Sequence, residues 1–212
     1  EIVVVDTGST DGSVQIAKIY TDKVYFFAWR DDFSAARNYA IEKSCSDYVM
    51  WLDADDCVPV KTINSVLNWK NDSAENADFY YLKYRMGYNS DFWFWRERII
   101  KRCKKCRFKG FIHEAVVPFG FTKRFDGEVI HTSSQNHASR NLNVYRKAIE
   151  NKKKFSPRDK YYYARTLIEN GMHNEALPVL RKFCYCKNAF SVDKAEAYKL
   201  IAFRYTFKLR EA

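Results

Sequence analysis

Long hydrophobic stretches are absent from this sequence of 212 residues. No apolar run approaches the roughly 18 residues that a membrane-spanning helix needs, and no signal-peptide pattern is present. The expected location is therefore the cytoplasm, with peripheral contact at the inner face of the membrane left open. Because the sequence starts with Glu1 and not with Met, directly before an apolar run, we expect the natural protein to begin upstream.

Cysteine is scattered and does not form a framework. The six cysteines are Cys45, Cys57, Cys103, Cys106, Cys184 and Cys186. Without a secretory signal, free thiols are the expected state. The pair Cys103-x-x-Cys106 has the spacing of half a zinc site, but no second pair has that spacing. The sequence therefore disfavours structural zinc.

The composition is that of a folded chain with an uneven charge. Hydrophobic residues make up 47% and aromatic residues 17% of the chain, which is too much for a disordered protein. Residues 136–212 hold 17 Lys+Arg against 7 Asp+Glu, whereas residues 1–135 hold 19 of each. This split predicts two domains, residues 1–135 and 136–212. The basic part could face anionic lipid or an acidic partner, or be a solvated helical surface rich in Lys.

The first half of the chain alternates between two periodicities. Short β-branched or aromatic runs predict strands, and apolar residues at helical spacing predict helices between them. The expected strands are Ile2–Val5, Val24–Phe27 and Tyr48–Leu52, and the expected helices are Ser13–Tyr20, Phe33–Glu42 and Thr62–Trp69. A hairpin of Phe79–Met86 and Phe92–Ile100 and short strands at Glu114–Val117 and Glu128–His131 follow. This order predicts an α/β fold with a parallel sheet and an antiparallel elaboration.

The last third reads as helices. Arg140–Lys154, Asp159–Gly171, His173–Cys184 and Asp193–Phe207 have amphipathic spacing. Ala164, Gly171 and Ala176 stand at the small positions of a tetratricopeptide-like repeat, although Phe183 replaces the usual late Ala. We expect a short array of helix pairs.

The strongest chemical signal is the stretch "WLDADDC", in which a buried strand ends in Asp53, Asp55 and Asp56. Because the side-chain period of a strand is two, Asp53 and Asp55 are expected to point the same way. Two close carboxylates favour a bound divalent cation, and oxygen ligands suit Mg²⁺ or Mn²⁺. A solvated acidic turn that caps the helix near Lys61 is the alternative.

A second polar stretch, "DTGSTDGS" at Asp6–Ser13, follows the first strand in the same way. If the sheet is parallel, Asp6 and Asp53 lie at the same edge, where open α/β sheets bind ligands. The stretch lacks the Gly-Lys-[Ser/Thr] of a P-loop and the G-x-G-x-x-G of a dinucleotide site. It could also be a turn with a helix cap supplied by Ser9, Thr10 or Asp11.

Three further stretches carry candidate groups. Arg37 in "DDFSAARNYAI" can bind a phosphate or a base carbonyl through two hydrogen bonds, or be an ordinary surface arginine. His113 and Glu114 in "FKGFIHEAVVP" could supply a general base or a substrate contact, or be a hydrogen-bonded pair at a strand start. His131 ends the strand "GEVIH", where a ligand role depends on a metal nearby.

In this order, "DTGSTDGS", "DDFSAARNYAI", "YVMWLDADD", "GFIHE" and "VIH" resemble the family 2 glycosyltransferases of the GT-A fold. The branch that the chain is most similar to carries tetratricopeptide-like helices after the catalytic domain. The resemblance covers about residues 1–150 and extends more loosely over the helices. It implies a Rossmann-like mixed sheet, a nucleotide-sugar donor with UDP favoured, a divalent cation (Mn²⁺ or Mg²⁺) and inversion at the anomeric carbon. It also implies a bacterial enzyme of cell-surface polysaccharide biosynthesis, with a glycan, lipid-linked or protein acceptor.

The resemblance also implies roles for individual residues. The nucleotide-sugar-binding residues would be Asp6, Thr7, Arg37 and Asp53. Asp55 and His131 would hold the metal, and Glu114 would be the base that deprotonates the acceptor, with His113 beside it. The family normally has one more strand before the segment that starts at Glu1, so we expect part of the donor site to lie upstream.

Two other classes of function compete with a transferase. A degenerate transferase-like scaffold could recruit a partner through its helical repeats. The basic stretch "KRCKKCRFK" suggests nucleic acid, but no nucleic-acid motif accompanies it and the "DADDC" edge is acidic. Nucleic acid is therefore not an expected partner.

Overall fold

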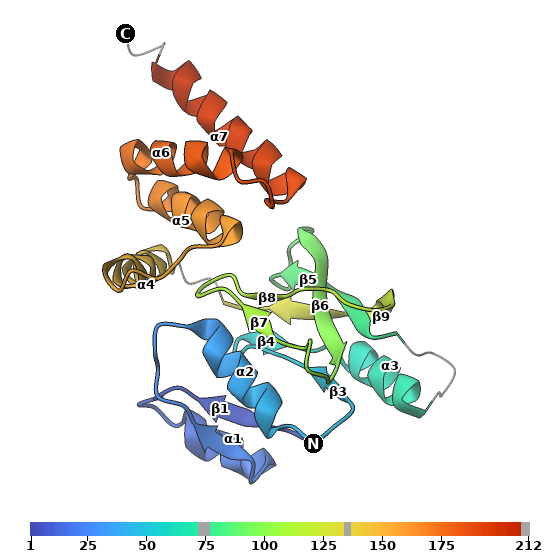
Figure 1. Ribbon diagram of the computed structural model, residues 1–212. Coiled ribbons are helices and arrows are strands. Elements are labelled where there is room, and N and C mark those ends of the chain that lie inside the picture. Colours follow the sequence, from blue (N-terminus) through green and yellow to red (C-terminus); the bar gives the residue numbers. More distant parts are fainter. Residues whose placement is uncertain (72–76, 134–136, 209–212) are drawn as a thin grey trace. The chain divides into compact units, whose positions relative to one another are not determined.

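The computed structural model of this chain describes residues 1–71, 77–133 and 137–208, with side chains up to residue 203 (Figure 1). The chain forms two compact units. The sheet unit comprises Glu1–Trp29, Ala35–Lys109 and Ala115–Gln135, and the helical unit comprises Arg30–Ser34, Gly110–Glu114 and Asn136–Ala212. Because two segments of the first 135 residues belong to the helical unit, the domain limits at 135 and 136 stay a prediction.

The sheet unit begins with a βαβ crossover. Strand β1 (Val4–Asp6) pairs in parallel with β2 (Val24–Phe26), and helix α1 (Ser13–Tyr20) connects them. Val4 lies opposite Val24 and Asp6 opposite Phe26. The parallel pairing agrees with the expectation from the β-branched run Ile2–Val5. Helix α1 is the crossover connection that a parallel pair of strands needs.

A second sheet has five strands in the order β3-β6-β5-β9-β4. These are β3 (Tyr48–Met50), β6 (Trp93–Lys101), β5 (Phe79–Met86), β9 (Thr122–His131) and β4 (Asp56–Cys57). All neighbours are antiparallel except β5 and β9, so the sheet is mixed. The expected α/β fold with a Rossmann-like mixed sheet is confirmed.

The expectation that one parallel edge carries both Asp6 and Asp53 is wrong. Strands β1 and β3 belong to different sheets, because β3 pairs with β6 in the antiparallel sense. Two short strands were also missed, β4 and β7 (Phe108–Lys109). β7 pairs with β8 (Ala115–Val116) in a small antiparallel hairpin.

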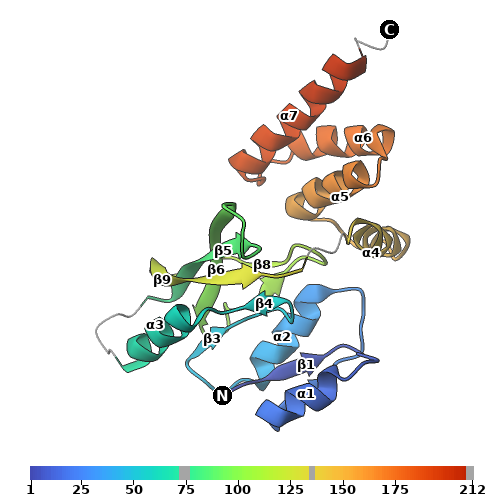
Figure 2. The same ribbon diagram turned by 180° about the vertical axis from the view of Figure 1, so that it is seen from behind.

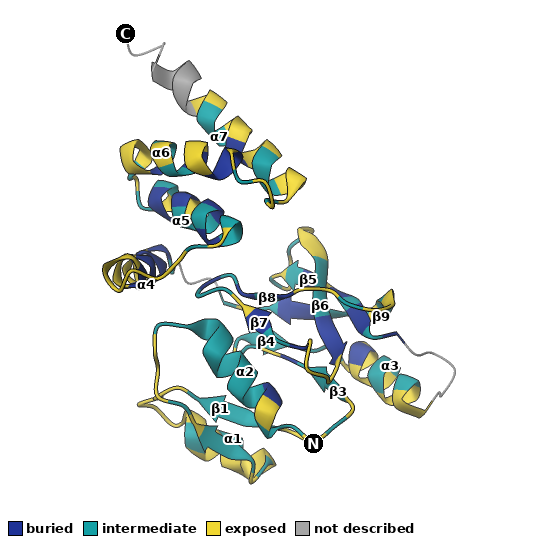
Figure 3. Ribbon diagram, in the orientation of Figure 1, coloured by how far each residue is buried: buried dark blue, intermediate teal, exposed yellow. Residues whose placement is uncertain are grey.

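The core of the sheet unit lies on both faces of β5 and β6, where Figure 3 shows the buried residues. Tyr80, Leu82 and Tyr84 alternate to the face that packs against Trp69 of α3 (Val60–Asn71). Phe79 packs with Ile41 of α2 (Phe33–Lys43), and further members of that cluster are Trp51, Ile100, Cys106, Phe108 and Val116.

The helical unit contains α4 (Ala138–Glu150), α5 (Pro157–Glu169), α6 (His173–Cys184) and α7 (Ser191–Lys208), which succeed one another in both views (Figures 1 and 2). A capping box of Ser156 and Asp159 starts α5. Gly171 follows α5 with φ +75°, a conformation that favours glycine. Ala164 and Ala176 are fully buried where α5 meets α6, which confirms the tetratricopeptide-like interpretation.

Among the described residues no helix is long and apolar enough to cross a membrane.

Cys106 and Cys103 are expected to differ sharply in reactivity. Cys106 is buried, and burial raises the pKa of its thiol to about 11, whereas Cys103 is exposed. At pH 8 we expect iodoacetamide to alkylate Cys103 at least about 10-fold faster than Cys106 in the folded protein, because the thiolate is the nucleophile. Peptide mass spectrometry measures both rates. If both thiols were equally protected from alkylation, and a chelator abolished that protection, the prediction would be contradicted. A zinc site that includes both cysteines would then be indicated.

Candidate functional site

The turn after β3 is held from several sides. Trp51 extends the pairing with β6 through its N–H, which donates to the carbonyl of Arg98. The N–H of Asp56 donates to the carbonyl of Asp53 at 3.0 Å, which closes the turn. Both the N–H and the hydroxyl of Thr132 donate to the carbonyl of Asp55 at 2.8 Å. The polar stretch "DADD" is therefore a fixed element of the sheet unit.

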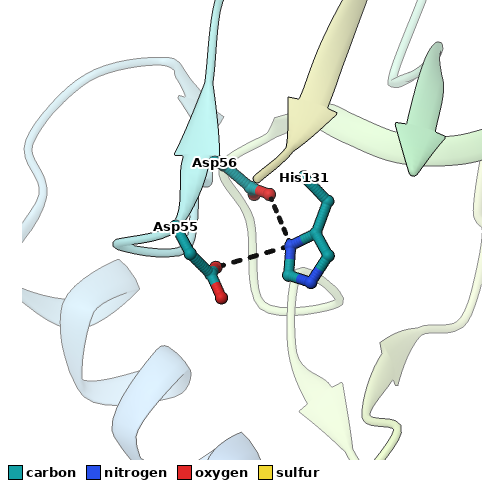
Figure 4. A group of neighbouring side chains, drawn as sticks. All are labelled: Asp55, Asp56 and His131. Atoms are coloured by element: carbon teal, nitrogen blue, oxygen red, sulfur yellow. Dashed lines mark ion pairs between the residues drawn. The ribbon is translucent and has the colours of Figure 1, made fainter. Parts of the chain in front are cut away.

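Strand pairing brings three potential metal ligands together (Figure 4). Asp56 on β4 lies directly opposite His131 at the end of β9, and residues opposite each other in an antiparallel pair share a face. His131 Nδ1 lies 3.5 Å from Oδ1 of Asp55 and 3.5 Å from Oδ1 of Asp56. The prediction named Asp55 and His131 together, and the structure brings them together.

Asp56 is already engaged by the protein. Its Oδ2 lies 2.8 Å from Nη1 of Arg98 and accepts the N–H of Asp53 at 3.0 Å. Its Oδ1 accepts the hydroxyl of Tyr84 at 2.8 Å. The side chain of Asp56 is fully buried, whereas those of Asp55 and His131 are 38% and 22% exposed. Of the three candidate ligands, Asp55 and His131 therefore have the more exposed side chains, and Asp56 is bonded within the turn.

The donor set fits a divalent cation. His131 Nδ1 is buried and has no hydrogen-bond partner, although two carboxylate oxygens lie near it. A cation between the imidazole and Asp55 would satisfy this nitrogen and offset the carboxylate charge. The residues present thus fit a divalent cation.

Arg37 and Asp53 form an ion pair, with Nη2 of Arg37 2.5 Å from Oδ1 of Asp53. The guanidinium of Arg37 also lies over the ring of Trp51, 4.3 Å from its centroid. The expectation that Asp53 points the same way as Asp55 is wrong, because Asp53 faces Arg37 while Asp55 faces His131. The turn breaks the strand period between the two residues. Two predicted donor-binding residues are instead placed against each other.

Asp6 and Thr7 lie at the end of β1. The carboxylate of Asp6 accepts the backbone N–H groups of Ser9 and Gly8. A hydrogen bond from the side chain of Ser9 has the largest effect in lowering the pKa of Asp6, and these two backbone groups lower it further. Gly8 has φ +112°, so this close turn requires glycine. The expected helix caps Ser9, Thr10 and Asp11 are not the N-cap of α1, which is Gly12, although Asp11 accepts the N–H of Ser13.

His113 and Glu114 belong to the helical unit, whereas the other predicted site residues belong to the sheet unit. They lie on the turn that joins β7 to β8. Glu114 is 5% exposed, and His113 has φ +56°.

Arg98 is a residue of this site that the sequence reasoning missed. Its side chain is fully buried, and its guanidinium lies between the rings of Trp51 and Tyr84, 3.9 and 4.2 Å from their centroids. Burial lowers the pKa of Arg98, and the charge of Asp56 opposes that shift. The stretch "WRERII" held the signal, because a charged residue in a buried strand needs a partner.

Comparison with known proteins identifies a family that covers the residues of this site. The sequence pattern of glycosyl transferase family 2 matches residues 1–159, three quarters of the chain. The chain belongs to glycosyl transferase family 2. The family match continues into α4 and the start of α5, beyond the limit expected at residue 135.

Three bacterial proteins similar to this family 2 chain have different names. A TPR repeat-containing protein of Synechococcus elongatus is 46% identical over 56 residues, 26% of this chain and 14% of that protein. An uncharacterized glycosyltransferase of Haemophilus influenzae is 34% identical over 74 residues, 32% of this chain and 30% of that protein. The glycosyltransferase SunS of Bacillus subtilis is 42% identical over 57 residues, 26% of this chain and 14% of that protein. The chain thus spans less than a third of the length of each of these relatives.

Proposed function

We propose that the protein is an inverting, metal-dependent glycosyltransferase that uses a nucleotide-diphosphate sugar, with UDP-sugars favoured. The observation that carries this proposal is the pair of Asp55 and His131 in a family 2 chain, in which the buried Nδ1 of His131 lies 3.5 Å from the carboxylate of Asp55 but has no hydrogen-bond partner. A divalent cation, Mn²⁺ or Mg²⁺, would be held by these two residues and would supply positive charge to the diphosphate leaving group.

Donor binding would use the polar ends of β1 and β3. Asp6 and Thr7 would contact the nucleobase side of the donor, and Asp53 would contact the ribose. Arg37 would contribute positive charge toward the diphosphate, and its pairing with Asp53 supports this role because it fixes the guanidinium on the ring of Trp51. Asp56 keeps the turn in shape through Arg98 and Tyr84.

The reaction would be a single displacement. The acceptor oxygen forms a bond to the anomeric carbon while the bond from that carbon to the diphosphate oxygen breaks. Glu114 takes the proton of the acceptor hydroxyl, and His113 lies next to it in the chain. Attack from the face opposite the leaving group inverts the configuration. Glu114 and Asp55 belong to different compact units, so their joint action rests on family chemistry and is tested by kinetics.

Replacing Asp55 by Asn tests the metal assignment. Because one ligand oxygen loses its charge, we expect Mn²⁺-dependent binding of UDP to weaken about 100-fold while the free energy of unfolding stays unchanged. Isothermal titration calorimetry of the full-length protein with UDP, with and without Mn²⁺, measures the effect. Asp47→Asn, an exposed carboxylate of the same unit, is the matched control. Binding in Asp55→Asn equal to that of the control would refute the assignment.

A cavity in the helical unit favours one alternative, a scaffold that recruits a partner. The cavity has a volume of about 310 Å³, and Leu177, Leu200 and Phe203 are among its lining residues. A full-length protein that binds neither UDP nor Mn²⁺ would support the scaffold.

The main proposal also includes a cytoplasmic location, with peripheral contact to an anionic membrane through the basic helices. Sedimentation with anionic vesicles tests that contact.

A further inference from the structure

We infer that helix α5 is a positioning element for the proposed base: Arg158 and Tyr162 hold the turn Gly110–Glu114 in the conformation that presents Glu114. This inference rests on the proposed role of Glu114. It gives the helical unit a part in the transfer reaction itself, in addition to any partner that it binds.

The turn needs an external constraint. His113 has φ +56°, a left-handed conformation that is unfavourable for a residue other than glycine. Gly110, three residues earlier, has φ +112°, and an added Cβ there would lie 3.7 Å from Oδ1 of Asp159. Such a backbone persists only where the surroundings over-determine it.

Arg158 and Tyr162 supply that constraint at His113. The Nε of Arg158 donates to the carbonyl of His113 at 3.0 Å. The imidazole of His113 stacks on the ring of Tyr162, with centroids 4.1 Å apart and an angle of 18° between the rings. Arg158 and Tyr162 are four residues apart and share a helix face, and the guanidinium lies 4.7 Å from the centroid of the Tyr162 ring. One face of α5 therefore holds both the backbone and the side chain of His113.

The rest of the turn is anchored to the same unit. Ile112 is buried in a cluster with Val144 and Tyr145 of α4. The ring of Phe111 packs on that of Phe155, with centroids 5.8 Å apart. Ile112 directly precedes His113 in the chain, and Phe111 and Phe155 pack against the cluster that contains Ile112. The helical unit thus anchors the two residues that precede the strained residue.

The position of α5 is itself fixed. Ser156 and Asp159 form the capping box at its start, and Asp159 is 5% exposed. Helix α5 packs on α6 through Ala164 and Leu180. Displacement of α5 would move Arg158 and Tyr162 together, and with them the turn that carries Glu114.

The inference predicts a specific kinetic pattern. Tyr162→Leu and Arg158→Gln should each lower kcat about 10- to 100-fold, because a small displacement of a catalytic group is costly. The KM for the donor should stay unchanged, because Arg37, Asp53 and Asp55 belong to the sheet unit. Tyr162→Phe, which keeps the stacked ring, should retain nearly full activity. The control is Arg146→Ala, an exposed arginine of the same unit whose side chain bonds to Met172 Sδ.

A second measurement is independent of activity. Amide hydrogen exchange across residues 111–115 of the full-length protein should accelerate at least about 10-fold in Tyr162→Leu and Arg158→Gln, and not in Tyr162→Phe or Arg146→Ala. Circular dichroism shows whether each variant folds. If Tyr162→Leu loses its helical signal, Arg158→Gln, which leaves the ring in place, carries the test.

The outcomes separate the two proposals. Unchanged exchange and unchanged kcat in both loss variants would overturn the inference. Faster exchange with unchanged kcat would also overturn it, because the turn would then be loosened without effect on the base. A wild-type protein without UDP binding would refute the proposed function, and the exchange rates alone would then decide whether α5 holds the turn.

Discussion

Replacing Glu114 by Gln is expected to lower turnover by a factor of about 10² to 10⁴. The amide has nearly the shape of the carboxylate but cannot take the acceptor proton, so the chemical step loses its base. Glu114 is 5% exposed on the β7–β8 turn, so an isosteric change there should leave the packing intact. Donor binding should be unaffected, because the proposed donor-binding residues lie in the sheet unit. Steady-state kinetics give kcat, and calorimetry with UDP and Mn²⁺ gives the binding constant.

The control for this prediction is Glu150→Gln, an exposed carboxylate at the end of α4. It should have wild-type turnover. If Glu114→Gln also turns over at the wild-type rate, Glu114 is not the base. A parallel loss of UDP binding would instead indicate a general disturbance of the fold, which the free energy of unfolding would reveal.

Replacing Arg98 by Met is expected to lower the free energy of unfolding by about 3–5 kcal/mol. Arg98 and Asp56 are both fully buried, with 2.8 Å between Nη1 and Oδ2. Removing the guanidinium leaves a buried carboxylate that keeps the hydrogen bonds from Tyr84 and the N–H of Asp53 and the contact with His131 Nδ1 at 3.5 Å. Urea unfolding of wild type and variant measures the difference. The same variant should weaken Mn²⁺-dependent UDP binding, because the turn that carries Asp55 loses its support.

Two further variants test the cause. Lys101→Met on the same strand removes an exposed charge that lies 3.6 Å from Asp78, and we expect a change below about 1 kcal/mol. Arg98→Met combined with Asp56→Leu should recover part of the loss, because an apolar pair leaves no uncompensated buried charge. A loss below about 1 kcal/mol in Arg98→Met alone would contradict the assignment of the pair as a buried support.

Local patterns in the sequence predicted most of the elements. The run Ile2–Val5 predicted a buried strand, and β1 covers Val4–Asp6, although its residues are only half-buried and Ile2 is exposed. The segment His173–Cys184 was expected as a helix, and α6 has those bounds. In such segments the periodicity of apolar residues and the positions of glycine and proline act over a few residues, so neighbours in the chain carry the information.

The candidate metal-binding pair was also predicted from the sequence. That prediction came from the family resemblance, which rests on the order of the motifs along the chain. Asp55 and His131 are 76 positions apart, and nothing local relates them. Antiparallel pairing of β4 with β9 is what places them within reach. Strand β4 has two residues, too few for a periodic signal, and so the sequence reading treated it as part of a turn.

What the sequence by itself determined is the family, the element order and the residue types at the acidic turn, because these depend on short patterns and on their order in the chain. Only the tertiary structure decided which polar side chains lie against each other: Asp53 with Arg37, Asp56 with Arg98, and Asp55 with His131. It also decided that the turn Gly110–Glu114 is held by α5. Charge pairing and the support of a strained turn depend on distances between segments far apart in the chain, and only the folded backbone sets these distances.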